Sequence, residues 1–210
     1  MLSLIMGSNG IDYVAAAVNG GILTEGEFSG SQMNEPITRQ EMARIVVRAA
    51  APSVKPATDE EFMYEATKAG LIQGLSGGEL GREEATTRAQ SVTVIERILT
   101  VKSGGKLPVD KAAVSYAEVD WRGTNLFTMW NSKPVQFPLE ITLGSGIKLT
   151  IYQMIVVDMT DPSGAYYEGF RQMNVEGRRG PLNNEYVIGY KISVKNETVK
   201  QHETTALPFF

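Results

Sequence analysis

An internal repeat constrains the fold of this chain more than any other feature. Residues 49 positions apart (87 minus 38) match without a gap across residues 11–100. The matched pairs are Tyr13 with Phe62, Ala17 with Ala66, Gly21 with Gly70, Ile22-Leu23 with Leu71-Ile72, Thr38-Arg39 with Thr87-Arg88, and Arg48 with Arg97. A repeat of this length indicates a supersecondary unit that cannot bury its apolar face alone. We therefore expect two such units, at about residues 11–52 and 60–101.

Each unit has the pattern of a helix, a glycine-containing loop and a second helix. Small and apolar residues recur at helical spacing in the first helix of each unit: Val14, Ala17, Val18 and Gly21, then Met63, Ala66, Thr67 and Gly70. Gly21 and Gly70 are well placed to end these helices, because glycine accepts the left-handed backbone that a helix C-terminus often needs.

The second helix of each unit has a clear start. Thr38-Arg39-Gln40-Glu41 and Thr87-Arg88-Ala89-Gln90 both fit a capping box, in which threonine accepts from the N3 amide and Glu or Gln reaches back. An apolar stripe follows each cap: Met42, Ile45, Val46 and Ala49 in one copy, and Ser91, Val94, Ile95 and Ile98 in the other. These patterns predict an α-helical N-terminal region over residues 1–102.

An arginine follows each capping threonine. A cation in the first helical turn faces the positive end of the helix dipole and costs about 0.3–1 kcal/mol relative to an anion. The free amides and a guanidinium together could bind an acidic ligand there. Alternatively, Arg39 and Arg88 form salt bridges with acidic neighbours, for which Glu35, Glu83 and Glu84 are available. Both interpretations remain open at this point.

Three segments resemble the S-layer homology domain. The sequence of residues 37–43 (ITRQEMA) is similar to the family's Thr-Arg-Ala-Glu signature, and residues 86–90 (TTRAQ) resemble a variant of it. Residues 69–74 (AGLIQG) resemble the family's Gly-Leu-(Ile/Val)-x-Gly turn. The resemblance covers nearly half of the chain. Such domains usually have three repeats, so a third unit would come from another chain of a homo-oligomer or has been truncated.

The resemblance implies non-catalytic anchoring of a surface protein of a Gram-positive bacterium to secondary cell-wall polysaccharide, often through pyruvate-ketal carboxylates. It implies an extracellular location, in the cell wall or S-layer. The signature arginines would contact the anionic sugar, and a neighbouring turn would complete the groove. The implied ligand-binding residues are Arg39, Arg88, Thr38, Thr87, Gly70 and Gly74.

The composition argues against several other classes of function. The chain has no cysteine, which removes disulfides, thiolate metal sites and thiol nucleophiles. His202 is the single histidine and lies among polar residues, so we expect no metal and no cofactor. A net charge of -4 without a basic run gives no reason to bind nucleic acid. No apolar run approaches the ~20 residues of a membrane span, and we expect any export signal to lie outside this chain.

After a linker at residues 103–108, the pattern changes to strand formers, turns and aromatics. The strands predicted are 113–119, 126–130, 139–143, 147–157 and 186–195. They would form an antiparallel sheet or sandwich over residues 110–210, with an outline similar to immunoglobulin-like domains, and make the protein a multidomain α+β chain.

Four smaller predictions concern the same region. We expect a hairpin at Gly144-Ser145-Gly146, and a turn rather than a calcium site at residues 158–164. Trp121 and Trp130 are expected to be buried.

Two other functions remain as alternatives to anchoring. One is a cell-wall polysaccharide hydrolase with two carboxylates in the β-rich region, and the other is a purely structural assembly module.

Overall fold

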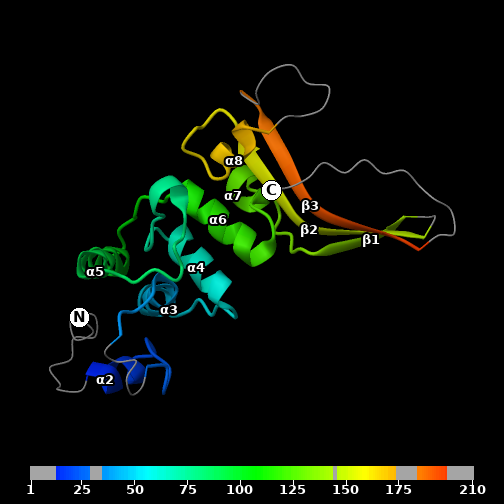
Figure 1. Cartoon of the computed structure of the whole chain (residues 1–210). Helices are drawn as coiled ribbons and strands as arrows, with labels where there is room; N and C mark the ends of the chain where they lie inside the picture. The colour runs from blue at the N-terminus through cyan, green and yellow to red at the C-terminus, as the bar shows by residue number, and fades with distance from the viewer. Residues whose placement is uncertain (1–12, 29–34, 144–145, 174–183, 198–210) are drawn as a thin grey trace. The chain divides into compact units, whose positions relative to one another are not determined.

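The computed structural model describes residues 13–28, 35–143, 146–173 and 184–197. The chain divides into two compact units, Met1–Ala117 and Glu118–Phe210 (Figure 1). Helices make up the described part of the first unit, and an antiparallel sheet with short helices makes up that of the second. The predicted α+β class is therefore confirmed.

The first unit contains the predicted helices in their predicted order. They are α2 (Tyr13–Asn19), α3 (Arg39–Ala50), α4 (Asp59–Lys68) and α5 (Arg88–Lys102). The 3-10 turn η2 (Ser76–Gly78) and α6 (Lys111–Arg122), which begins in this unit, were not predicted as helices. Helix α3 packs against both α4 and α5. Fully buried side chains from three helices form the core, among them Val46, Met63 and Ile98.

Both capping boxes are present as predicted. Thr38 Oγ1 accepts from the Glu41 amide at 3.1 Å, and Glu41 Oε2 accepts from the Thr38 amide at 2.7 Å. In the second copy, Thr87 Oγ1 accepts from the Gln90 amide at 3.2 Å, and Gln90 Oε1 accepts from the Thr87 amide at 2.8 Å. The apolar stripe of α3 is fully buried, and that of α5 is buried except for the partly exposed Ile95.

The turns after α2 and α4 have the same hydrogen bonds, 49 residues apart. The amides of Ile22 and Leu23 both donate to the Ala17 carbonyl, as those of Leu71 and Ile72 do to Ala66. Gly21 and Gly70 have φ values of 68° and 70°, as expected for glycines that end helices. Arg48 donates to the Ile22 carbonyl at 3.4 Å, and Arg97 donates to that of Leu71 at 3.2 Å.

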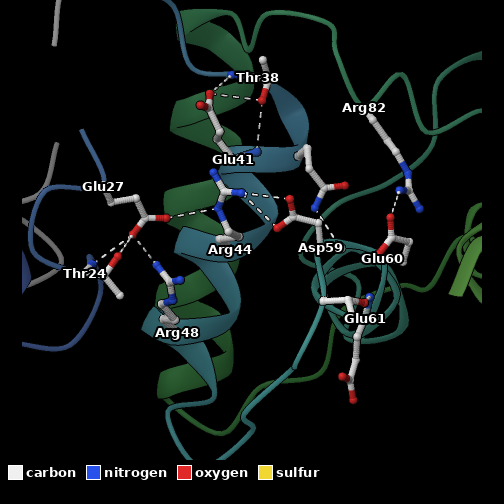
Figure 2. A network of polar contacts seen from close by, with 12 residues as sticks. Thr24, Glu27, Thr38, Glu41, Arg44, Arg48, Asp59, Glu60, Glu61 and Arg82 are labelled. Atoms are coloured by element: carbon white, nitrogen blue, oxygen red, sulfur yellow. Dashed lines mark hydrogen bonds and ion pairs between the residues drawn. The ribbon is translucent and has the colours of Figure 1, made fainter. Parts of the chain in front are cut away.

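A buried carboxylate connects the loop after α2 to α3 (Figure 2). The side chain of Glu27 is 9% exposed and lies 2.6 Å from Arg48 Nη1 and 3.1 Å from Arg44 Nε. Arg44 also reaches Asp59 at the start of α4, at 2.9 Å. Burial raises the pKa of Glu27, but hydrogen bonds from Thr24 and the charge of Arg48 outweigh it, so that the pKa lies below its ordinary value of 4.5.

The second unit is built on one three-stranded sheet. Its strands are β1 (Leu139–Leu143), β2 (Ile147–Asp158) and β3 (Tyr186–Asn196), antiparallel and in the order β1-β2-β3. Two short helices, α7 (Leu126–Trp130) and α8 (Tyr167–Arg171), contact β2. The strands predicted at 139–143, 147–157 and 186–195 are confirmed. Of the two sheet architectures predicted, the described residues form the single sheet and include no second one.

Two of the strand predictions are wrong, because residues 113–119 lie in α6 and residues 126–130 form α7. In α6, the buried residues Ala113, Val114 and Ala117 follow a helical spacing that the strand interpretation overlooked. Helix α7 depends on a distant group, since the Glu118 carboxylate accepts from the amides of Phe127 at 3.1 Å and Thr128 at 2.8 Å. Such a cap is not visible in the local sequence.

The smaller predictions for this region have mixed outcomes. β1 and β2 pair as a hairpin does, with residues 144 and 145 outside the described residues. Asp158 and Asp161 each accept from an amide two residues on, as the predicted turn requires. Trp130 is 44% exposed and packs edge-on against Tyr186, and Trp121 is half-buried under the Arg122 guanidinium. The predicted burial of Trp130 is therefore wrong.

We predict that Glu27→Gln lowers the free energy of unfolding by about 2 kcal/mol at pH 7, because Arg48 and Arg44 lose the carboxylate that both pair with. The folded-state pKa of Glu27 is depressed, so its contribution is complete above pH 4.5 and disappears as the pH falls through the folded-state value. Urea unfolding of both proteins between pH 3 and 8 measures this. A difference between them that does not narrow in acid would contradict the assignment.

Candidate functional site

A cavity of about 270 Å³ lies in the first unit, between the start of α3, the turn after α4 and one face of α5. Its lining residues are Arg39, Met42, Ile72, Gln73, Gly74, Leu75, Thr86, Ala89, Gln90, Thr93, Val94 and Arg97. The lining contains two guanidinium groups and no carboxylate. The cavity is therefore suited to a ligand with negative charge.

Arg39 is held in place by backbone carbonyls. Its side chain is buried, and it donates from Nε to the Leu80 carbonyl at 2.7 Å and from Nη2 to that of Gln73 at 2.6 Å. Burial lowers the pKa of Arg39 and the charge of Glu84 opposes this effect, but an arginine stays protonated in either case. Neither sequence interpretation anticipated this arrangement, in which the arginine fixes the turn that forms one wall of the cavity.

Arg97 is the functional candidate that sequence reasoning missed. It donates from Nη1 to the Leu71 carbonyl and from Nη2 to Gln73 Oε1, at 3.2 and 3.0 Å. Its counterpart Arg48 is neutralised by Glu27. The 49-residue shift places Ser76 where a second Glu27 would stand, and among the described residues Arg97 has no carboxylate partner.

Comparing the two copies at the position of Glu27 would have revealed this difference from the sequence. A partly buried arginine whose charge is balanced by a carboxylate in one copy and not in the other points to a site at the second copy. We therefore regard Arg97, together with Arg39, as the source of positive charge in the cavity.

The cavity also contains an unused polar group. The hydroxyl of Thr86 is buried and has no hydrogen-bond partner within the part of the chain that the structure describes. Buried hydroxyls are normally paired, since an unpaired one costs about 1–3 kcal/mol. Because this hydroxyl is almost inaccessible, a ligand in the cavity would bond to it only after the Thr86 side chain turned toward the cavity.

The structure brings only some of the predicted residues together. Arg39 and Gly74 line the cavity, whereas Thr38 and Thr87 cap their helices. Gly74 lies in the tight turn before η2, where an added Cβ would meet the Gly78 Cα at 2.5 Å, and its amide donates to Asp110 Oδ2 at 3.1 Å. Gly70 lies just after the C-cap of α4, has a left-handed backbone, and does not line the cavity.

Arg88 differs from its counterpart Arg39. It is exposed at the start of α5, lies outside the cavity lining, and has no acceptor among the described residues. Arg39, in the first repeat copy, bonds the turn at Gln73 in the second copy. The equivalent contact for Arg88 would therefore require a third copy.

Other arrangements in the described residues do not suggest a second site. No group of three His, Asp or Glu side chains gathers there as a metal site would require. None of the described helices combines the length and apolar character needed to cross a membrane. Glu118, which is almost completely buried, is occupied with the amides of α7.

Comparison with protein families supports the resemblance. The family model of the S-layer homology domain matches residues 52–90, a stretch that includes α4, the turn with Gly70 and Gly74, and Thr87-Arg88. No curated protein and no solved structure matches the chain.

The chain therefore carries an S-layer homology domain. Domains of this family anchor proteins to cell-wall polysaccharides and are non-catalytic in themselves. The protein is accordingly associated with the cell surface or cell wall.

We predict that Gly70→Ala destabilises the chain more than Gly21→Ala does. Both glycines have a left-handed backbone, which costs a residue with a Cβ about 1 kcal/mol. An added Cβ at Gly21 meets nothing within 4 Å, whereas one at Gly70 meets the Pro108 carbonyl oxygen at 2.6 Å. A backbone atom cannot move aside cheaply, so we expect a further cost of about 1–3 kcal/mol. Equal urea midpoints for the two variants would contradict this prediction.

Proposed function

We propose that the chain anchors its protein to an anionic secondary cell-wall polysaccharide, and that the cavity holds a carboxylate of that polymer, such as a pyruvate ketal. The observation that carries this proposal is the pair of arginines, Arg39 and Arg97, in a lining that contains no carboxylate. The ketal itself comes from the family resemblance.

The size and the walls of the cavity fit a short piece of glycan. A volume of about 270 Å³ lies just below the usual range of small-molecule pockets, about 300–1,000 Å³, and so favours one sugar with its acidic substituent. Apolar side chains such as Met42 and Val94 could pack against a sugar ring. Thr86, Thr93 and Gln90 offer polar groups to its hydroxyls.

The two arginines have different roles in this proposal. Arg39 already bonds two carbonyls and fixes the turn, so its contribution is positioning together with long-range charge. Arg97 shares its guanidinium between one carbonyl and a neutral amide, and it can exchange the latter for a carboxylate. Thr38, Thr87 and Gly70 would act by holding the helix starts and the turn in place.

Arg88 belongs to a second, equivalent site in this proposal. Two repeat units, at 11–52 and 60–101, would provide one complete groove within the chain. The groove beside Arg88 would be completed by a third repeat unit, supplied by another copy in a homo-oligomer. The solvent exposure of Arg88 supports this role, since its charge is available to a partner.

The described carboxylates of the second unit do not favour the hydrolase alternative. The buried carboxylate, Glu118, accepts from two backbone amides and lies 4.0 Å from Arg122, an arrangement that stabilises α7. The assembly alternative has an observation of its own, which is the exposed apolar surface of the sheet.

We predict that Arg97→Gln weakens binding to purified cell-wall sacculi tenfold or more, because a charge-assisted hydrogen bond contributes about 1.5–3 kcal/mol. A pull-down with sacculi that carry pyruvylated polysaccharide measures it. The matched control is Lys102→Gln, which removes an exposed positive charge from the same helix outside the cavity. Thermal melts should show that both variants are folded.

The same assay contains the outcomes that would contradict the proposal. Failure of the parent chain to bind sacculi would refute anchoring, whereas equal binding of the parent and Arg97→Gln would refute the cavity as the site. Sacculi treated with mild acid to remove ketal-linked pyruvate should retain less of the parent. Arg88→Ala tests the second groove, and sugar release from the sacculi would favour the hydrolase.

A further inference from the structure

The outer half of the sheet has two faces of opposite character. On one face, Leu139, Ile141 and Leu143 of β1 stand opposite Ile151, Leu149 and Ile147 of β2. Ile192 and Val194 of β3 continue the same rows. Residues directly opposite each other in an antiparallel pair share a face, so these eight aliphatic side chains form one surface, here named the apolar sheet face.

The reverse face of the same strands is polar. Its residues are Glu140, Thr142, Lys148, Thr150, Ser193 and Lys195. A sheet that is apolar on one side and charged on the other is built to bury its apolar side. The apolar sheet face therefore requires a covering layer.

The described residues of this unit leave the apolar sheet face open. The five side chains on its two outer strands are exposed by 39–47%. The helices are attached at the other half of the sheet, where Asn125 is hydrogen-bonded in both directions to Val156 and Val157 packs against Phe170. Figure 1 shows the outer half of the three strands extending away from α7 and α8.

The size of the surface suits a dimer. The exposed parts of its eight side chains amount to roughly 500 Å², in the upper range for an apolar patch on a monomer. Two copies facing each other would bury roughly 1,000 Å² in total, about the lower limit for a specific interface. Tyr190, two residues before Ile192 on β3, is exposed as well and would extend the surface.

The chemistry of the surface selects a second copy as its partner. The apolar sheet face carries no charge that would guide a partner of complementary charge. It is a sheet surface, which packs best on another sheet of similar size about 10 Å away. Each further copy of the chain presents such a surface, and a twofold axis places identical surfaces against each other.

We propose that two copies of this chain associate face to face through the apolar sheet face, forming a two-layered sandwich between chains. This dimer does not depend on the proposed wall binding, because none of the residues of the cavity takes part. If the chain also binds the wall, each dimer carries two binding units, and their linkage raises the overall affinity for a polymer with repeated sites.

The test is the mass of the full-length chain in solution, measured by sedimentation velocity from 1 to 100 μM. The parent should approach twice its 22.9 kDa as concentration rises. Ile141→Glu should remain at 22.9 kDa, because it places a charge within the buried interface. The matched control Thr142→Glu alters the next residue of the same strand on the polar face and should dimerise like the parent.

Thiol labelling provides a second measurement in case Ile141→Glu does not fold. The chain has no cysteine, so Ile141→Cys and Thr142→Cys each create a single reactive site. The thiol at position 141 should be protected at high concentration and become reactive on dilution, whereas that at position 142 should react at all concentrations. A monomeric parent at 100 μM, a dimer insensitive to Ile141→Glu, or equal labelling of both thiols would each overturn the proposal.

Discussion

The helical unit depends on arginine side chains that donate to the carbonyl groups of glycine-containing turns. Arg48 and Arg97, near the ends of α3 and α5, bond the turns after α2 and α4. Arg39, at the start of α3, bonds the segment after α4 from the other side. Turn carbonyls have no partners in regular secondary structure, so a guanidinium with five donors can satisfy several at once. These bonds join helices whose apolar stripes could not be buried singly.

The same interaction shows how the two copies differ in charge. In the first copy the arginine charge is balanced by Glu27, which also receives hydrogen bonds from Thr24. In the second, serine occupies the equivalent position and the positive charge remains beside a cavity. Residues 27 and 76 thus give Arg48 and Arg97 surroundings of different charge, and in the proposed function this difference suits the second copy to an acidic ligand.

The second unit is a sheet that helices cover only in part. Its helices cover one half of a sheet and leave eight aliphatic side chains of the other half in contact with solvent. A three-stranded sheet of this kind is marginal without a layer over its apolar side. The sandwich expected from the sequence would, in the proposed dimer, be formed between two chains rather than within one.

The sequence by itself determined the helices of the first unit, because capping boxes, terminal glycines and apolar stripes act within a few residues. It also determined three strands through their alternation. Only the tertiary structure decided that residues 126–130 are helical, since their cap comes from Glu118 in another helix. It likewise placed Arg39 and Arg97 at one cavity and left Arg88 outside it, because side-chain partners 24 or more residues away in sequence are set by packing and not by local pattern.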